Sequence, residues 1–323
     1  MTPARAPIAV VGAGLMGHGI AQVFACDGHH VAVQDPVAGA LATVHRRVAA
    51  NLGRLGLSEE ALERISLHTR LEDALHGAAF VFEAAPEDVE LKRTLMEEIT
   101  RFASADAIVA STTSSMPVAV FSSRAAGKAR VIGAHWWNPP YLIPLVEVVQ
   151  GDETSAETVA RTIGLLSAVG KLPVHLHRDV PGFVANRLQH ALWREAMSIV
   201  QHGICDAETV DLCVKNSFGL RLAVLGPLET ADLGGLDLAL NIHEQILPFI
   251  DCTPGPLAIL REKVAAGELG MKTGRGFRTW TEEQASAAHA RLVEHLTAAL
   301  AAHPRGRQAP ELGDSPAPPD ATP

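Results

Sequence analysis

The first half of the chain alternates short apolar runs with longer stretches of mixed polarity. The apolar runs are rich in Val and Ile, which is typical of strands buried on both faces of a parallel sheet. They cover residues 8–11, 31–34, 80–83, 108–111, 131–135 and 145–149. Stretches of helical character lie between them, for example over 89–102 and 156–169. The alternation predicts an α/β fold with a doubly wound, mostly parallel sheet.

One connection in this half is much longer than the others. Residues 37–68 are predicted to form a helical insertion, and four arginines are scattered along it: Arg46, Arg47, Arg54 and Arg64. From about residue 179 the strand signals disappear, and helical character takes over. Helices are predicted over 183–201, 207–217, 236–250 and 256–266.

These patterns divide the chain into three parts. Residues 1–178 are expected to form the α/β domain, and residues 179–303 an all-helical C-terminal domain. Residues 304–323 hold six of the twenty prolines and almost no large apolar side chain. Such a segment cannot bury a core, so we predict a disordered tail.

The helical domain also predicts an oligomer. Its stretch 236–250 is apolar on more than one face, through Leu236, Leu238, Ala239, Leu240, Ile242, Ile246 and Leu247. A helix that is apolar over so wide an arc needs burial on two sides. One short domain covers only one of them comfortably, so we expect a homodimer through this domain.

Composition and charge narrow the class of protein. The 323 residues are 47% hydrophobic and 20% charged, which is ordinary for a globular protein and excludes a disordered chain or a coiled coil. No apolar run is long enough to span a bilayer, and the start lacks the apolar core of a signal peptide, so we expect a cytoplasmic protein. The formal net charge of −9 argues against nucleic acid and anionic membranes as partners. The four cysteines lack metal-ligand spacing, and no metal site is expected.

A glycine-rich turn provides the strongest local signal. Gly12, Gly14 and Gly17 fit the pattern G-x-G-x-x-G between the strand 8–11 and a helix over 15–25 that begins with Leu15 and Met16. The first glycine makes the tight turn, the second lets the backbone approach a pyrophosphate, and the third lets helix and strand pack closely. The helix start supplies amide donors and its dipole, so this segment predicts a Rossmann-type dinucleotide site.

An acid at the end of the next strand selects the cofactor. Asp35 lies about 20 residues beyond the turn, where a carboxylate binds the ribose 2′-hydroxyl of the adenosine. The next residue is Pro36 rather than an arginine. Because an acid without a neighbouring arginine repels a 2′-phosphate, NAD is favoured over NADP.

His135 is the best candidate for a general base. It ends the apolar run 131–135, and ligands of open α/β sheets bind at the carboxyl ends of strands. Glu147 lies within a second apolar run, where an unpaired acid would be costly to bury. In one interpretation Glu147 orients His135. In the other, His135 is an ordinary core histidine and Glu147 faces solvent on an edge strand. These two residues alone leave both interpretations open.

Neighbouring residues favour the catalytic interpretation slightly. Trp136 and Trp137 follow His135 directly, and they suit either the core or the wall of a dry pocket. Hydroxyl groups within 111–115, including that of Ser114, follow another strand and suit either the same crevice or a helix cap. Asn186 lies early in the first helix of the second domain, where its amide is able to hydrogen-bond a reacting oxygen.

These segments together resemble the L-3-hydroxyacyl-CoA dehydrogenase family. The matching pieces run in the family's order from about residue 8 to residue 280, and they cover 12–22, 82–93, 111–116, 135–139, 145–148, 181–188, 226–232 and 270–277. The resemblance implies an NAD-binding Rossmann domain with a helical insertion, followed by a helical domain for substrate and dimerisation. It implies the general acid/base role for His135, its paired carboxylate for Glu147, and positions near the nicotinamide for Glu87 and Lys92.

The resemblance also gives Ser114 and Asn186 the role of binding the substrate oxygen and positioning the histidine. It implies an NAD-dependent oxidation of the 3-hydroxyl group of a 3-hydroxyacyl-CoA. Thr112 and the pair Trp136-Trp137 depart from the family's usual Asn and Phe-Phe. Residues 138–144 look more like branches that oxidise free hydroxy acids, such as L-gulonate, carnitine and pyridine-carboxylate dehydrogenases.

Three functions are therefore weighed. The first is the 3-hydroxyacyl-CoA dehydrogenase, for which Arg46, Arg47 and Arg54 are candidate ligands of the coenzyme A phosphate. The second is the same chemistry on a small free hydroxy acid or alcohol, whose carboxylate Arg187 or Arg221 would bind. The third is a non-catalytic NAD-binding protein, which would not need His135, Glu147, Ser114 and Asn186 together.

Overall fold

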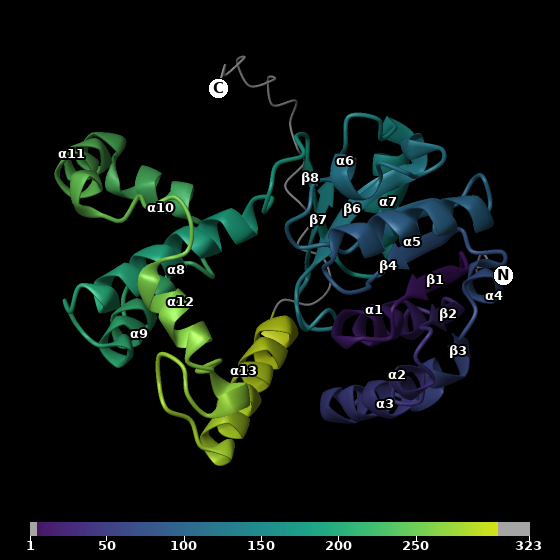
Figure 1. Ribbon diagram of the computed structural model, residues 1–323, viewed down its shortest axis with the longest axis horizontal. Coiled ribbons are helices and arrows are strands. Elements are labelled where there is room, and N and C mark those ends of the chain that lie inside the picture. Colours follow the sequence, from purple (N-terminus) through teal and green to yellow (C-terminus); the bar gives the residue numbers. More distant parts are fainter. Residues whose placement is uncertain (1–4, 303–323) are drawn as a thin grey trace. The chain divides into compact units, whose positions relative to one another are not determined.

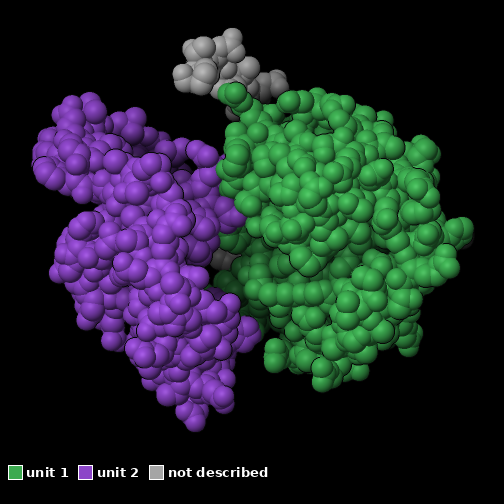
Figure 2. All heavy atoms as spheres, viewed as in Figure 1, with its two compact units in different colours: residues 1–183, 293–323 green, residues 184–292 purple. Residues whose placement is uncertain are grey.

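The computed structural model describes residues 5–302, and the chain forms two compact units (Figures 1 and 2). The first unit contains the chain up to Phe183 and the residues from Val293 onward, and the second contains Val184–Leu292. The division falls five residues after the predicted boundary at 178/179, because Phe183 is fully buried within the first unit. The predicted tail 304–323 lies outside the described residues.

The first unit is built on one eight-stranded sheet of order β3-β2-β1-β4-β5-β6-β7-β8 (Figure 1). Six strands were predicted: β1 (Ile8–Val11), β2 (Val31–Gln34), β4 (Phe80–Glu83), β5 (Ile108–Ser111), β6 (Val131–Trp136) and β7 (Leu145–Val149). All neighbouring strands are parallel except β6 and β7. The predicted Rossmann-type, mostly parallel sheet is thus confirmed.

Both faces of the sheet are buried, as the uninterrupted apolar runs predict. In β1, Ile8 and Val10 face one hydrophobic cluster, whereas Ala9 and Val11 face the other. Successive side chains of a strand point to opposite faces, so an all-apolar strand needs a helical layer on each side. One cluster includes residues of α1 (Leu15–Cys26), α3 (Val44–Leu55) and α7 (Ala156–Ala168), and the other of α4 (Leu71–Leu75), α5 (Val89–Phe102) and α6 (Val118–Phe121).

The predicted helical insertion 37–68 is wrong in its last four residues. It contains α2 (Ala38–Leu41), α3 and the 3-10 helix η1 (Glu59–Arg64), but it ends in β3 (Ile65–His68). This strand pairs in parallel with β2 at the edge of the sheet. Only Ile65 of the strand is fully buried, so an apolar run of the kind seen in the central strands is missing here. The other additional strand, β8 (Leu172–Leu176), pairs with β7.

The second unit is helical in its described residues apart from isolated bridges around Arg275. The helices from residue 184 onward are α8 (Ala185–Gln201), α9 (Ala207–Lys215), η3 (Phe218–Leu220), α10 (Pro227–Gly234), α11 (Leu236–Ile246), η4 (Leu247–Phe249), α12 (Ala258–Ala265), η5 (Met271–Thr273) and α13 (Glu282–Ala302), whose last residues count with the first unit. The helix predicted over 236–250 tightens to a 3-10 turn at Leu247, next to Pro248. Within residues 5–302, no helix is both long and apolar enough to cross a membrane.

Candidate active site

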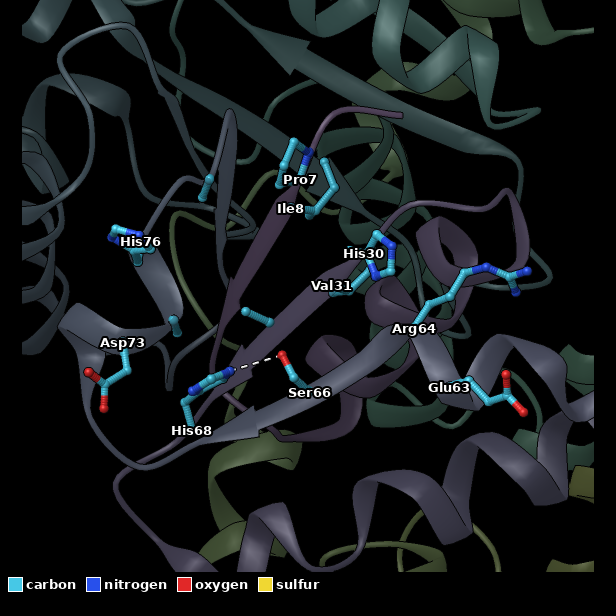
Figure 3. A pocket seen from close by; sticks show the side chains of 13 residues that line it. Pro7, Ile8, His30, Val31, Glu63, Arg64, Ser66, His68, Asp73 and His76 are labelled. Atoms are coloured by element: carbon cyan, nitrogen blue, oxygen red, sulfur yellow. Dashed lines mark hydrogen bonds between the residues drawn. The ribbon is translucent and has the colours of Figure 1, made fainter. Parts of the chain in front are cut away.

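A hollow of about 250 Å³ opens on the first unit, but it is not where the predicted site residues lie (Figure 3). Most of its lining comes from the amino ends of strands, including Ile8 of β1 and Val31 of β2. His68, which bonds the Ser66 hydroxyl, also borders it. No group of three or more His, Cys, Asp or Glu side chains in the described chain is arranged to hold a metal ion. The predicted residues gather instead at the carboxyl ends of the strands.

The glycine turn between β1 and α1 has the shape that a dinucleotide requires. A Cβ atom at Gly12 would lie 2.6 Å from the Ala84 carbonyl oxygen, and one at Gly17 would lie 1.8 Å from the Gly12 oxygen. Gly12 also has a φ of 109°, which strains any other residue. Gly14 differs, because a Cβ atom there would meet nothing within 4 Å. The chain leaves open space at the position where the backbone is expected to approach a pyrophosphate.

Helix α1 presents its amino terminus beside this turn. Gly14 is its N-cap, no side chain caps the helix, and its first turn contains no acid, so the positive end of the helix dipole is available to an anion. Leu15 and Met16, the first two helical residues, are exposed and half-buried respectively. Asp35 follows β2, and its two carboxylate oxygens accept hydrogen bonds from the Ala13 and Val37 amides, each at 2.9 Å. These bonds fix the carboxylate beside the glycine turn.

His135 and Glu147 form a buried pair. They lie directly opposite each other in the antiparallel pairing of β6 and β7, so their side chains share one face of the sheet. His135 Nδ1 lies 2.8 Å from Glu147 Oε2, and the two residues are 4% and 1% exposed. The interpretation with a solvent-facing Glu147 is therefore wrong. A carboxylate accepts hydrogen bonds, so the contact assigns the donor role to Nδ1–H of His135 and leaves Nε2 as the ring nitrogen not bonded to Glu147.

The two tryptophans after His135 divide between core and site. Trp136 points to the opposite face and packs edge-on against Phe24 and Phe82. Trp137 lies on the side of His135, with ring centroids 5.2 Å apart, and Phe183 packs against the same imidazole at 5.5 Å. The base is therefore walled by two aromatic rings, which restrict its access to water.

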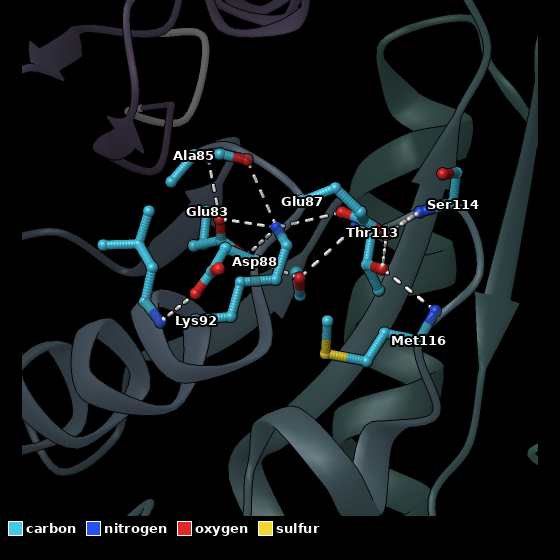
Figure 4. Close-up of polar contacts among 10 residues, drawn as sticks. Glu83, Ala85, Glu87, Asp88, Lys92, Thr113, Ser114 and Met116 are labelled. Atoms are coloured by element: carbon cyan, nitrogen blue, oxygen red, sulfur yellow. Dashed lines mark hydrogen bonds and ion pairs between the residues drawn. The ribbon is translucent and has the colours of Figure 1, made fainter. Parts of the chain in front are cut away.

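A second polar cluster lies at the carboxyl ends of β4 and β5 (Figure 4). The buried Lys92 on α5 places its ammonium 2.8 and 3.0 Å from the two oxygens of Glu83. The Ser111 hydroxyl and the Ala85 amide donate to the same carboxylate at 2.6 and 2.7 Å. Four hydrogen bonds thus stabilise a carboxylate that has no exposed surface.

Glu87 connects this cluster to the loop that follows β5. Its carboxylate accepts hydrogen bonds from the Thr113 hydroxyl and, at 3.2 Å, from the Ser114 amide. Lys92 Nζ lies 3.5 Å from its other oxygen. Thr113 in turn accepts from the Met116 amide at 3.1 Å, so the loop that carries Ser114 is fixed at several points (Figure 4).

The two units match the two domains of a known enzyme family. Residues 7–180 match the NAD-binding domain of 3-hydroxyacyl-CoA dehydrogenase, and residues 182–280 match its C-terminal domain. The chain belongs to the 3-hydroxyacyl-CoA dehydrogenase family. The predicted NAD-dependent dehydrogenase acting on CH–OH groups is thereby confirmed.

Relatives in this family carry different substrate names. The chain is 34% identical over 297 residues to a 5-formyl-3-hydroxy-2-methylpyridine 4-carboxylate 5-dehydrogenase from Mesorhizobium japonicum, covering 90% of this chain and 96% of that one. It is 41% identical over 232 residues to an L-carnitine dehydrogenase from Streptomyces coelicolor, covering 71% and 73%. A solved structure of an NAD+-dependent dehydrogenase for the same pyridine carboxylate gives a TM-score of 0.85 at 33% identity, covering 91% and 96%. A (S)-3-hydroxybutyryl-CoA dehydrogenase from Ralstonia eutropha gives 0.69 at 34%, covering 85% and 99%.

The structure brings most of the predicted residues to one edge of the first unit's sheet. The glycine turn, Asp35, Glu87 and His135 all lie at or just beyond carboxyl ends of strands. Lys92 is more deeply placed than we expected, since it is 1% exposed and directed at Glu83. Asn186 belongs to the second unit, and its role stays a prediction.

Glu83 was not selected from the sequence, and Ser111 was included only as a member of the hydroxyl-bearing segment 111–115. Glu83 ends an apolar run, and a carboxylate at the carboxyl end of a buried strand is the signal that could have identified it. Its partner Lys92 is nine residues away along the chain, and only the return of α5 over the sheet brings the two together.

Proposed function

We propose that this enzyme oxidises the hydroxyl group of a small free hydroxy acid or alcohol, with NAD as the hydride acceptor. The buried pair His135–Glu147 is the observation that carries the chemistry. The choice of a free substrate is supported by the relatives, because the pyridine-carboxylate dehydrogenase aligns over nine-tenths of the chain. An acyl-CoA substrate, which the sequence resemblance implies, is the second hypothesis.

His135 is proposed as the general base. Because its Nδ1–H is held by Glu147, the lone pair of Nε2 is free to take the hydroxyl proton of the substrate. The neighbouring carboxylate then stabilises the imidazolium that forms. Trp137 and Phe183 keep bulk water from this nitrogen, which strengthens the electrostatic contribution of Glu147.

The residues of the first unit fit the cofactor. The Gly12–Gly17 turn and the amino terminus of α1 would hold the pyrophosphate, and Asp35 would bind the adenosine ribose. When bound, NAD would supply the acceptor for the hydride of the substrate carbon, and His135 would take the hydroxyl proton. Ser114 and Asn186 are proposed to hydrogen-bond the substrate oxygen, and Glu87 to lie beside the nicotinamide half.

The arginines do not separate the two substrates. The guanidinium of Arg47 donates to the Ala13 carbonyl at 3.2 Å and is thus bound to the glycine turn. Arg46 and Arg54 are exposed on α3, and Arg187 and Arg221 are exposed as well. Arg187 and Arg221 are the proposed ligands of a substrate carboxylate.

A substrate screen tests this proposal. NADH fluorescence would be followed with free 3-hydroxy acids, L-carnitine and 5-formyl-3-hydroxy-2-methylpyridine 4-carboxylate, in parallel with 3-hydroxybutyryl-CoA. We expect turnover with at least one free substrate at a kcat/KM above that for the CoA ester. A higher kcat/KM for 3-hydroxybutyryl-CoA than for every free substrate would contradict the proposal and support an acyl-CoA substrate.

A further inference from the structure

The cluster at the ends of β4 and β5 contains more negative than positive charge. Lys92 bonds both oxygens of the fully buried Glu83, at 2.8 and 3.0 Å, and its contact with Glu87 is longer, at 3.5 Å. The ammonium is therefore balanced mainly by Glu83. The carboxylate of Glu87 remains as one formal negative charge without a full counter-ion.

Glu87 is also the member of the cluster that faces outward. Its side chain is 40% exposed, whereas those of Lys92 and Glu83 are 1% and 0% exposed. Nearby Asp88 adds a second carboxylate, although this one caps α5 through the Leu91 amide at 2.8 Å. Figure 4 shows both acids at the same end of α5.

No arginine of the same region neutralises Glu87. The guanidinium of Arg93 lies 2.6 Å from one oxygen of Glu90, and that of Arg124 lies 2.8 Å from the other. Both cations are thus paired with a different acid. The negative charge at Glu87 is a property of the folded site, and the hydrogen bonds from Thr113 and Ser114 fix its position.

The order of the strands indicates which half of a dinucleotide meets this charge. β1 lies between β2 and β4, so the glycine turn that follows β1 is flanked by the ends of both neighbours. A dinucleotide lies across the sheet at such a switch point. Asp35, after β2, marks the adenosine side. The other side is formed by the residues after β4 and β5, where the Ala84 amide donates to the Val11 carbonyl at 2.7 Å and a Cβ atom on Gly12 would meet Ala84.

We propose that the Glu83–Lys92–Glu87 cluster discriminates between the oxidation states of the cofactor. The nicotinamide ring of NAD+ carries a positive charge, and the ring of NADH is neutral. One uncompensated carboxylate beside the ring favours NAD+, while Glu83 acts as a positioning residue that keeps Lys92 from neutralising Glu87. The inference rests on the cofactor site of the proposed function and is independent of the substrate.

The test is the ratio of two dissociation constants. Binding of NAD+ and of NADH to the full-length protein would be measured by calorimetry at low ionic strength. Glu87→Gln should lower Kd(NADH)/Kd(NAD+) at least about fivefold, which is the effect of one unit charge about 4 Å away even in bulk water. Added salt should lower the ratio of the unmodified protein and leave that of the variant almost unchanged.

Charge balance gives a sharper pair of variants. Glu83→Gln leaves the Lys92 ammonium free to offset Glu87, so the ratio should fall as it does in Glu87→Gln. The double variant Glu83→Gln with Lys92→Met removes both buried charges and restores the single charge of Glu87. Its ratio should return toward that of the unmodified protein. If Glu83→Gln fails to fold, the double variant and Glu87→Gln still decide the matter.

A matched control separates the charge at Glu87 from a general loss of affinity. Asp35→Asn also removes one carboxylate charge, but on the adenosine side. It should weaken NAD+ and NADH by the same factor and leave the ratio unchanged. If Glu87→Gln also weakens both forms equally, or if the double variant keeps the low ratio, the proposal is overturned. None of these measurements depends on turnover, so failure of the substrate assignment would be recognised separately.

Discussion

The two units differ in how much of their own apolar surface they bury. In the first unit, both faces of the sheet are covered by clusters of fully buried side chains. In the described part of the second unit, only Ser198 and Leu257 are buried. Leu240 of α11 is 62% exposed and Phe249 is 87% exposed. The first unit supplies its own core, whereas the helices of the second present apolar faces that one copy of the chain leaves uncovered.

The largest effect that we expect is catalytic and tests whether the first unit carries the chemistry. His135→Gln should lower turnover by a factor on the order of 10²–10⁴, the usual contribution of general acid–base catalysis. NAD affinity should be retained, because the glycine turn follows a different strand. Turnover would be measured per NAD-binding site, with thermal stability recorded alongside.

The control for this variant is His175→Gln. His175 belongs to β8 of the same sheet, and its Nε2 bonds the Gln150 side chain at 3.0 Å. Its replacement should lower the thermal stability and leave turnover almost unchanged. Near-native turnover in folded His135→Gln protein would refute the mechanism and leave only the cofactor site.

The second prediction concerns the uncovered faces of the second unit. We predict a homodimer through this unit, with α11 in the interface, so light scattering at micromolar concentration should give twice the chain mass. Leu240→Glu would place a charge in that apolar interface and should weaken dimerisation at least about a hundredfold, since desolvating an unpaired charge costs several kcal/mol. Leu57→Glu, at a residue that is 49% exposed in the first unit, is the matched control. A monomeric mass for the unmodified protein would contradict the prediction.

The third prediction concerns the preference for NAD over NADP. It should be a smaller effect than the two above, and it depends on residues of the first unit. NAD should bind at least about tenfold more tightly than NADP, equivalent to 1.4 kcal/mol. Asp35→Ala should reduce this preference, and it should also weaken NAD itself because Asp35 holds the Ala13 and Val37 amides. Asp73→Ala, at an exposed acid of α4, should change neither affinity. Equal affinities of the unmodified protein for NAD and NADP would overturn the argument.

The last prediction concerns the dependence of stability on pH, which is small at any one pH near 7. Burial lowers the pKa of Lys171 to about 7, from 10.5 for an exposed lysine. The amine donates to the carbonyls of Pro140 and Ile143, and it lies 5.2 Å from the centre of the Trp136 ring. Below pH 7 the buried group is charged in both states, and the full cost of its desolvation is present. Between about pH 7 and 10.5 only the unfolded chain holds the proton, so the contribution of Lys171 to stability improves as the pH rises.

Urea unfolding at several pH values would measure this contribution. The free energy of unfolding should gain up to about 1.4 kcal/mol per pH unit relative to Lys171→Met, whose curve lacks the Lys171 contribution. Lys128→Met, which removes a surface ion pair with Glu153, should keep the slope of the unmodified protein. Parallel curves for the unmodified protein and Lys171→Met would show that Lys171 keeps an ordinary pKa.

Strands with two buried faces could be predicted from the sequence, and edge strands could not. The six predicted strands are mostly apolar runs, whereas β3 has one buried, one exposed and two half-buried positions. Four residues of this kind are too few to be distinguished from the end of a helical segment. In the second part of the chain, helical spacing predicted α8, α9, α11 and α12, but it missed α10 and α13. Next to Pro248, the helix expected over 236–250 tightens to a 3-10 turn.

The site could be predicted wherever its chemistry depends on local sequence. The glycine turn and Asp35 belong to one strand–helix–strand segment, and His135 and Glu147 belong to one hairpin. Glu83 was not predicted, because its role in the site depends on the ion pair with Lys92. The packing of α5 on the sheet brings the two side chains together. The position of Glu83 at the end of a buried strand was a signal for the acid alone, and nothing in the sequence named Lys92 as its partner.

The pairing of β6 and β7 has a consequence for rearranging the chain. Register alone places His135 opposite Glu147, and the two residues are twelve positions apart. The base and its acid therefore belong to one continuous segment, Val131 to Val149, which a circular permutation can carry intact. Asp35 and the glycine turn depend instead on the pairing of β1 with β2 and of β1 with β4, which joins Ile8 to Phe80. New chain ends placed between β1 and β4 would thus be expected to disrupt the cofactor site, while the pair His135–Glu147 would stay within one continuous segment.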